Sequence, residues 1–219
     1  MRTLLLVTQL VMVSFSGRAA AEPAKDWLYF DLGEVIVTGN PTAGYTYVPG
    51  AMAYLTAMRA QGYKLALITN IPESWGATCE LKYQTLQTFL GTRLHEPVPM
   101  EWTKFDAVVV PPFDRYRKPH PFMFLAGLAN ACPGRTLYVG ELAQEVQTAK
   151  GLGFATFHAP TGGPSPLPEP TLVQQLLDTQ FTFQQPAGCD FSGIVPPVLA
   201  PQDAQNGVVA CVVDPLTVH

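Results

Sequence analysis

Three polar side chains in this sequence follow short apolar runs. Asp31, Thr69 and Glu141 each stand at or just after the end of such a run. Carboxylates can act as nucleophiles or bind hard cations, and a hydroxyl can donate a hydrogen bond to an anion. In open parallel sheets, ligands bind beyond the carboxyl ends of the strands. If the apolar runs are strands of one such sheet, the three side chains lie at one site.

The apolar runs alternate with segments whose hydrophobic residues recur with a helical period. This alternation predicts which elements hold the three polar side chains in place. Strands that alternate with helices imply crossover connections and a parallel sheet covered on both faces. The sequence therefore predicts an α/β, Rossmann-like fold of three layers, with residues 33–48 as an irregular hairpin or flap. The expected strands are 27–30, 64–68, 105–110, 137–139 and 155–157, and the expected helices are 49–61, 80–90, 121–131 and 146–152.

The chain divides into three segments. Residues 1–21 have a positive start, an apolar stretch and a small-residue cleavage site, which is typical of a secretory signal peptide. An uncleaved N-terminal anchor is the alternative. Residues 22–160 form the predicted core, and residues 161–219 contain a linker, a short helix at 171–178 and a C-terminal extension. We expect a secreted or periplasmic protein with no membrane contact after cleavage.

Composition excludes one class of partner and indicates a packed core. Hydrophobic residues make up 47% of the chain and charged residues 14%, which is typical of a globular protein. The formal net charge is −4, and no basic stripe is present to neutralise phosphates. Nucleic acid is therefore not an expected partner.

The four cysteines are Cys79, Cys132, Cys189 and Cys211. An even number of cysteines in an exported chain favours disulfides, and the absence of a Cys-x-x-Cys spacing argues against a zinc site. Three pairings are conceivable. We expect Cys189 with Cys211, because that bridge would close the C-terminal tail, and consequently Cys79 with Cys132.

Four segments resemble the motifs of the haloacid dehalogenase (HAD) superfamily, in the order typical of that family. The resemblance covers about residues 27–158, and the gaps between the motifs leave no room for a cap domain. The chain is similar to the capless histidinol-phosphate and heptose-bisphosphate phosphatases. The four segments are Tyr29 to Ile36, Leu67 to Asn70, Arg117 to Pro121 and Leu137 to Glu145.

This resemblance implies a HAD-like fold without a cap domain and a secreted, Mg²⁺-dependent phosphatase that forms an aspartyl-phosphate. Its substrate would be a small or larger phosphorylated molecule. The implied catalytic residues are Asp31 as nucleophile, Thr69 and Lys118. The implied phosphate-binding residues are Thr69, Asn70 and Lys118, and the implied Mg²⁺ ligands are Asp31, the Gly33 carbonyl, Glu141 and Glu145.

Two positions depart from the family pattern. Gly33 stands where the family usually has a second aspartate that acts as general acid and base, and Glu141 stands where aspartate is usual. Glu34 follows directly and is a candidate replacement acid. The alternative function is therefore a catalytically impaired HAD-fold protein that serves as a binding or interaction module. An open site also fits closure by a partner chain, so an oligomer stays an alternative.

Overall fold

The computed structural model describes residues 24–161, 167–192 and 211–218. The predicted signal peptide at residues 1–21 lies outside the described residues. Among the described helices, none is both long and apolar enough to cross a bilayer.

A six-stranded sheet forms the centre of the molecule, in the order β7-β6-β1-β4-β5-β8. Every neighbouring pair is parallel except β5 and β8, which are antiparallel. The predicted parallel sheet is therefore confirmed, with one antiparallel edge strand that the sequence did not predict. The strands are β1 Trp27–Phe30, β4 Lys64–Ile68, β5 Ala107–Val110, β6 Thr136–Gly140, β7 Ala155–His158 and β8 Cys211–Val213.

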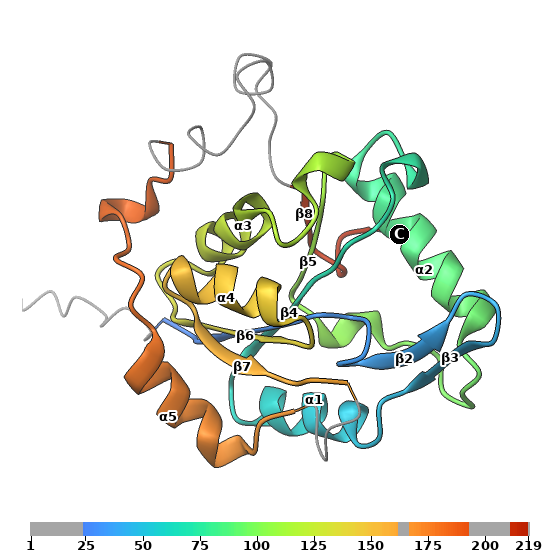
Figure 1. Cartoon of the computed structure of the whole chain (residues 1–219), viewed down its shortest axis with the longest axis horizontal. Coiled ribbons are helices and arrows are strands. Elements are labelled where there is room, and N and C mark those ends of the chain that lie inside the picture. Colours follow the sequence, from blue (N-terminus) through green and yellow to red (C-terminus); the bar gives the residue numbers. More distant parts are fainter. Residues whose placement is uncertain (1–23, 162–166, 193–210, 219) are drawn as a thin grey trace, which may run out of the picture.

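Helices cover both faces of this sheet, which confirms the three-layer α/β prediction (Figure 1). Because strand side chains alternate between faces, Leu28 and Phe30 pack into one core and Tyr29 into the other. The first core is covered by α1 Ala51–Ala60, α2 Cys79–Arg93 and α5 Pro170–Gln180, and the second by α3 Pro121–Ala131 and α4 Ala143–Gly151.

Local sequence signals account for where two of these helices begin. The Thr78 hydroxyl accepts a hydrogen bond from the Leu81 backbone N–H at the start of α2, 3.2 Å away. Pro121 occupies the first position of α3, where its missing N–H and fixed φ are tolerated. Such signals act within one helical turn and can therefore be recognised in the sequence. For this reason the predicted bounds of α3 agree with the observed ones.

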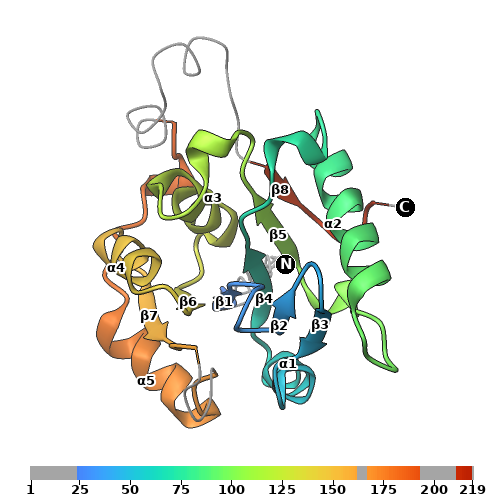
Figure 2. The same ribbon diagram turned by 45° about the vertical axis from the view of Figure 1, so that its right-hand side comes forward.

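A two-stranded flap, β2 Val37–Asn40 and β3 Gly44–Tyr47, lies between β1 and α1. The Tyr45 carbonyl accepts a hydrogen bond from the His95 backbone N–H, 2.8 Å away, so the flap is joined to the chain that leaves α2. Figure 2 shows the flap and α2 on the same side of the sheet. Short 3₁₀ turns complete the connections: η1 Glu73–Trp75, η2 Trp102–Lys104, η3 Asp114–Tyr116 and η4 Ala187–Cys189.

The described C-terminal elements, α5 and β8, pack into the core instead of lying over it. Helix α5 buries Val173, Leu176 and Leu177 against the sheet, and β8 pairs with β5. The sequence analysis missed β8 because a three-residue strand gives no measurable period.

The predicted disulfide pairing is wrong. The structure joins Cys79 to Cys211 and Cys132 to Cys189, with Cα–Cα distances of 5.2 and 5.8 Å. The expected Cys189–Cys211 bridge assumed a tail that closes on itself. Instead β8 is an edge strand beside the start of α2, and η4 lies beside the end of α3, so each tail cysteine meets a helix.

Peptide mapping of the unreduced protein should recover Cys79 linked to Cys211. The Cys79→Ser/Cys211→Ser double variant should lose about 2–5 kcal/mol in free energy of unfolding, because this bridge closes a loop of 132 residues. Urea denaturation measures the loss. Linked peptides that contain Cys79 and Cys132 would contradict the structure.

Candidate active site

The predicted site residues come from the carboxyl ends of three neighbouring strands. Asp31 follows β1, Thr69 follows β4 and Glu141 follows β6, and β1 lies between the other two strands. Since the chain leaves β1 and crosses to neighbours on both sides, this edge has the geometry of a ligand-binding switch point. Backbone bonds fix the strand ends: Asp31 N–H donates to Val139 O over 2.9 Å, and Thr69 N–H to Val109 O over 3.1 Å.

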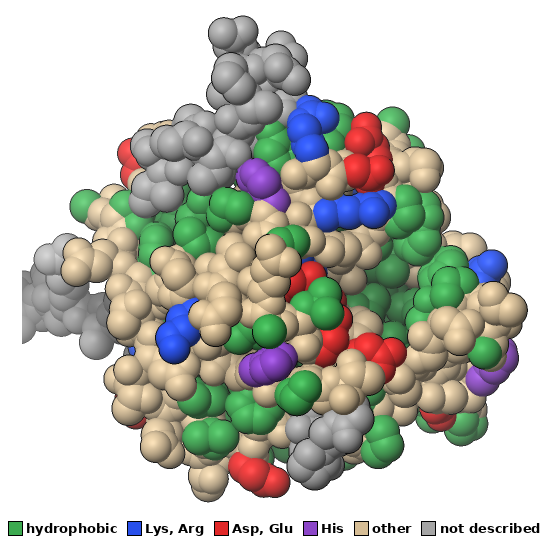
Figure 3. Space-filling view, viewed as in Figure 1, with side chains coloured by type: hydrophobic (Ala, Val, Ile, Leu, Met, Phe, Trp, Pro, Cys, Tyr) green, Lys and Arg blue, Asp and Glu red, His purple; other side chains and the backbone are tan. Residues whose placement is uncertain are grey.

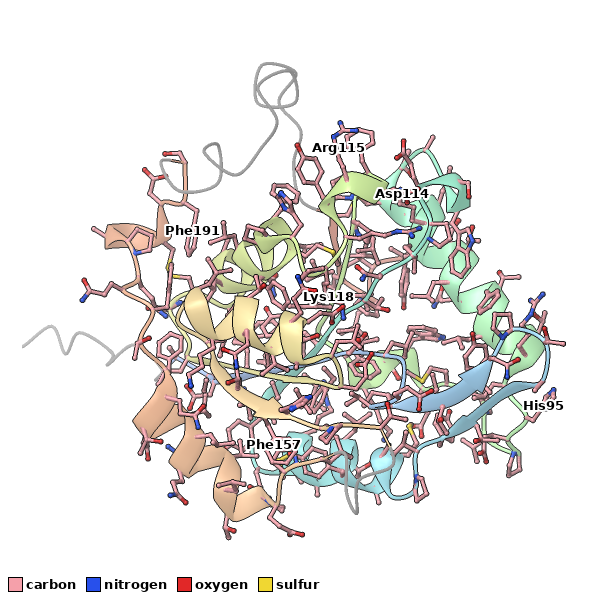
Figure 4. All side chains as sticks on the ribbon, viewed as in Figure 1. His95, Asp114, Arg115, Lys118, Phe157 and Phe191 are labelled. Atoms are coloured by element: carbon pink, nitrogen blue, oxygen red, sulfur yellow. A yellow bond between two sulfur atoms is a disulfide. The ribbon has the colours of Figure 1, made fainter. Side chains whose placement is uncertain are left out.

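A buried lysine joins this edge from a fourth segment. The Lys118 Nζ lies 2.7 Å from Asp31 Oδ2 and 2.8 Å from Glu145 Oε2, and it donates to the Tyr138 hydroxyl over 3.1 Å. An ammonium has three donors, so all are satisfied. The Lys118 side chain is 1% exposed, and Figure 4 shows it near the centre of the molecule.

The backbone of Lys118 is held as firmly as its side chain. Its N–H donates to Asn70 Oδ1 over 2.7 Å, and its carbonyl accepts from Asn70 Nδ2 over 3.0 Å. Both ends of the Asn70 amide are thereby used. Asn70 is a positioning residue in this structure, and a contact between it and phosphate stays a prediction.

Opposite charges control the ionisation of this group. Burial alone would lower the pKa of Lys118, but the charges of Asp31 and Glu145 outweigh it and raise the pKa. Burial and the two nearby carboxylates raise the pKa of Tyr138 well above its ordinary value. The site therefore contains a lysine that stays charged and a phenol that stays neutral at neutral pH. The Tyr138 hydroxyl donates to Glu145 Oε2 over 2.9 Å.

Glu141 lies beside Asp31 and has one oxygen that this network leaves unpaired. Its Oε2 is buried and has no hydrogen-bond partner among the described residues. Burial, and then the negative charge of Asp31, raise the pKa of Glu141 to about 8. When Asp31, Glu141 and Glu145 are all ionised, three negative charges face the single positive charge of Lys118. The site is therefore short of positive charge.

The available donors fit a hard divalent cation. Carboxylate oxygens of Asp31 and Glu141 face each other, and no described backbone hydrogen bond ends on the Gly33 carbonyl. No cluster of three or more His, Cys, Asp or Glu side chains able to hold a metal occurs in the part of the chain that the structure describes. Two carboxylates and a carbonyl suit Mg²⁺, which keeps several of its waters when bound.

The structure therefore separates the two predicted acidic ligands. Glu141 lies beside Asp31 with an unpaired oxygen, whereas the Glu145 Oε2 is occupied by Lys118 and Tyr138. The predicted contact of Glu145 with Mg²⁺ stays a prediction. The sequence analysis did not identify Tyr138 as a site residue, because a single tyrosine in an apolar strand is typical of a core residue.

A cavity opens beside this charged group. It measures about 270 Å³ and shares Gly33, Thr69 and Asn70 with the predicted site. Figure 3 shows acidic side chains near the middle of this face, beside a hollow with hydrophobic side chains on its other side. The Thr69 hydroxyl has no hydrogen-bond partner among the described residues, so it is available to a ligand at the end of this cavity.

Comparisons with known proteins return structural likeness only. No protein-family model and no curated protein sequence matches the chain. The chain is similar to the crystal structure of a HAD family enzyme from Bacteroides thetaiotaomicron in complex with magnesium and inorganic phosphate, with 11% identity, a TM-score of 0.45, and coverage of 64% of this chain and 96% of that one. It is also similar to a HAD-like phosphatase from Mesorhizobium loti, with 16% identity, a TM-score of 0.42, and coverage of 71% and 86%.

The raised pKa of Glu141 predicts how the metal-free protein responds to pH. Folded Glu141 keeps its proton up to about pH 8, whereas the unfolded chain loses it near 4.5. This contribution to stability is complete below about pH 4.5 and is lost as the pH rises through 8. In EDTA, the urea midpoint should fall less between pH 5 and 8.5 for Glu141→Gln than for the wild type. Equal slopes would contradict this prediction.

Removal of the buried ammonium should be costly. We expect Lys118→Met to lose about 3–5 kcal/mol in free energy of unfolding, because Asp31 and Glu145 would stay buried without a counter-charge. Adding Glu145→Gln should restore part of the loss. Lys104→Met, which breaks the more exposed pair with Glu101, is the control and should cost about 1 kcal/mol or less. Equal losses in the two lysine variants would refute the assignment.

Proposed function

We propose that this protein is an exported, Mg²⁺-dependent phosphomonoester hydrolase of the HAD type, with Asp31 as nucleophile. The observation that carries the proposal is the arrangement of Lys118. A fully buried ammonium contacts Asp31 at the carboxyl edge of a parallel sheet, while Glu141 lies nearby with an unpaired buried oxygen. An ion pair that served stability alone would not account for the unpartnered oxygen of this second acid.

The first chemical step is attack of an Asp31 carboxylate oxygen on the phosphorus of the ester. Lys118 fixes the orientation of Asp31, since one Asp31 oxygen accepts from Lys118 and the other from the Leu32 N–H over 2.7 Å. The new bond joins Asp31 to phosphorus as the bond to the leaving oxygen breaks. Thr69 donates a hydrogen bond to the transferring phosphoryl group.

The second step hydrolyses the aspartyl-phosphate. Water attacks phosphorus, inorganic phosphate leaves with the oxygen of that water, and the Asp31 carboxylate is regenerated. Lys118 does not move between the steps, because Glu145, Tyr138 and Asn70 hold it at both ends. Lys118, which contacts the nucleophile, is thus held in place before the reaction begins. Preorganised charges of this kind are usually the largest contribution to transition-state stabilisation.

The candidate ligands of Mg²⁺ are Asp31, Glu141 and the Gly33 carbonyl. When bound, the ion neutralises the excess negative charge of the site and of the substrate phosphate. Glu145 is assigned a different role, which is to position Lys118. The contacts support this division, because the Glu141 Oε2 has no partner among the described residues, whereas the Glu145 Oε2 is occupied by Lys118 and Tyr138.

Export of the protein is the remaining part of the proposal. Two disulfides among the described residues support an oxidising compartment, and the N-terminal sequence supports a signal peptide. The alternative, a binding module with impaired catalysis, is supported by Gly33, which cannot serve as general acid or base.

A survey of aryl, alkyl and sugar phosphates with Mg²⁺ tests the proposal. The wild type should release phosphate from at least one class, and Asp31→Asn should reduce the rate by about 10³-fold or more, as expected for loss of a nucleophile. Asp190→Asn, at an exposed and distant acid, is the matched control and should keep full activity.

Chelation tests the metal separately. EDTA should abolish turnover and Mg²⁺ should restore it. Full activity in EDTA would remove Mg²⁺ from the proposal, and no phosphate release above the Asp31→Asn level would favour the binding module.

A further inference from the structure

The cavity beside Asp31 has an unusual lining for a phosphatase that acts on polar metabolites. Apart from Thr69 and Asn70 at one end, it is lined by apolar and aromatic side chains, with Tyr45, Trp75 and Phe89 as the aromatic walls. Among the described residues, no Asp, Glu, Lys, Arg or His side chain lines it. A sugar or a second phosphate placed here would leave its polar groups without partners, which is costly.

The aromatic walls contact one another around Phe89. The ring centroids of Trp75 and Phe89 are 4.8 Å apart in a tilted arrangement, and those of Tyr45 and Phe89 are 5.9 Å apart edge to face. An apolar cavity of about 150 Å³ can hold benzene. At about 270 Å³, this one has room for an aromatic ring with substituents or for a fused pair of rings.

Hydrogen bonds from α2 hold these walls in place. The Thr85 hydroxyl donates to the Trp75 carbonyl over 2.7 Å, and the buried Lys82 Nζ donates to the carbonyls of Glu73 and Pro112 over 3.3 and 3.0 Å. On the opposite wall, Tyr45 is fixed through its backbone bond to His95. The cavity is therefore preformed, and a ring can enter it without reorganisation of its walls.

Gly33 adds an independent constraint on the leaving group. A Cβ at this position would meet no atom within 4 Å, so Gly33 faces open space where a longer side chain would fit. The nearby candidate acid Glu34 accepts a hydrogen bond from the Thr38 hydroxyl over 2.8 Å and does not line the cavity. Glu141 would be ionised once it binds Mg²⁺, and no described acid lines the cavity. The leaving oxygen therefore departs without a proton from the protein.

A leaving oxygen that receives no proton must be a stable anion. An alkoxide is poor in this respect, because its conjugate acid has a pKa of about 16, similar to water. A phenolate is far better, because phenols such as tyrosine have a pKa of about 10. General acid help is worth about 10²–10⁴-fold, so its absence selects strongly between these two classes.

We propose that the substrates are aryl phosphates, the phosphate monoesters of phenols, with the aromatic ring seated among Tyr45, Trp75 and Phe89. This inference rests on the proposed phosphatase function. Asp31 forms its bond to phosphorus as the phosphorus–oxygen bond of the ester breaks. The phenolate leaves with the electron pair and takes a proton from water.

Phenyl phosphate and benzyl phosphate provide the decisive comparison. Both present one aromatic ring, but benzyl phosphate releases an alcohol. We expect kcat/KM to be at least about 10²-fold higher for phenyl phosphate, and to rise further along a series of more acidic phenols. Equal values for phenyl and benzyl phosphate would overturn the inference while leaving the phosphatase proposal intact.

Position 33 offers a gain-of-function test. Gly33→Asp should have a kcat/KM for benzyl phosphate about 10²-fold above that of the isosteric Gly33→Asn, which offers no acid, and should depend less on the leaving group. The backbone carbonyl is the same in all three proteins. Equal kcat/KM values for the Asp and Asn variants would contradict the assigned role of the missing acid.

The ring-binding part is tested at Trp75. Trp75→Leu should lower kcat/KM for phenyl phosphate by about tenfold, in line with loss of an aromatic contact. Inhibition of the Trp75→Leu variant by inorganic phosphate should equal that of the wild type, which would show that the charged site is still assembled. Phe89→Leu is the second variant. Unchanged kcat/KM in both variants would overturn the placement of the ring.

If no substrate is turned over above the Asp31→Asn level, the phosphatase proposal and this inference both fail.

Discussion

The contact between Lys118 and its three partners is the constraint on which this site depends. An ammonium buried this deeply is tolerated only when every donor is satisfied and opposite charge is close. Asp31, Tyr138 and Glu145 meet those conditions from the end of β1, the middle of β6 and helix α4. The sheet order, with β1 between β4 and β6, is what brings these groups within reach of one lysine.

The contacts of Lys118 also explain why the site has more negative than positive charge. Lys118 brings one positive charge to Asp31 and Glu145, and Glu141, whose pKa is about 8, would add a further negative charge once it is ionised, so the surplus would lie at Asp31 and Glu141. A divalent cation would neutralise that surplus, which is why the electrostatics and the donor chemistry point to the same ion.

The wall of the cavity depends on parts of the chain remote from the charged residues. Helix α2 carries Phe89 and supports Trp75, and its first residue, Cys79, is bonded to Cys211 in β8. Because β8 is paired with β5, the disulfide ties the helix to the edge of the central sheet. A tail that resembled an extension in the sequence thus fixes one side of the candidate substrate cavity.

Short-range patterns determined much of this protein from the sequence. The period of two in strands and of 3.6 in helices, with caps such as Pro121, acts over a few residues. It therefore predicted the α/β class, five strands, and the places of Asp31, Thr69 and Glu141 at strand ends.

Only the tertiary structure decided the remaining features. The disulfide partners, the attachment of Glu145 to Lys118, the role of Tyr138 and the aromatic cavity all join residues distant in the chain, 132 positions apart for Cys79 and Cys211. No local period encodes such a contact, because it depends on which faces of separate elements pack together.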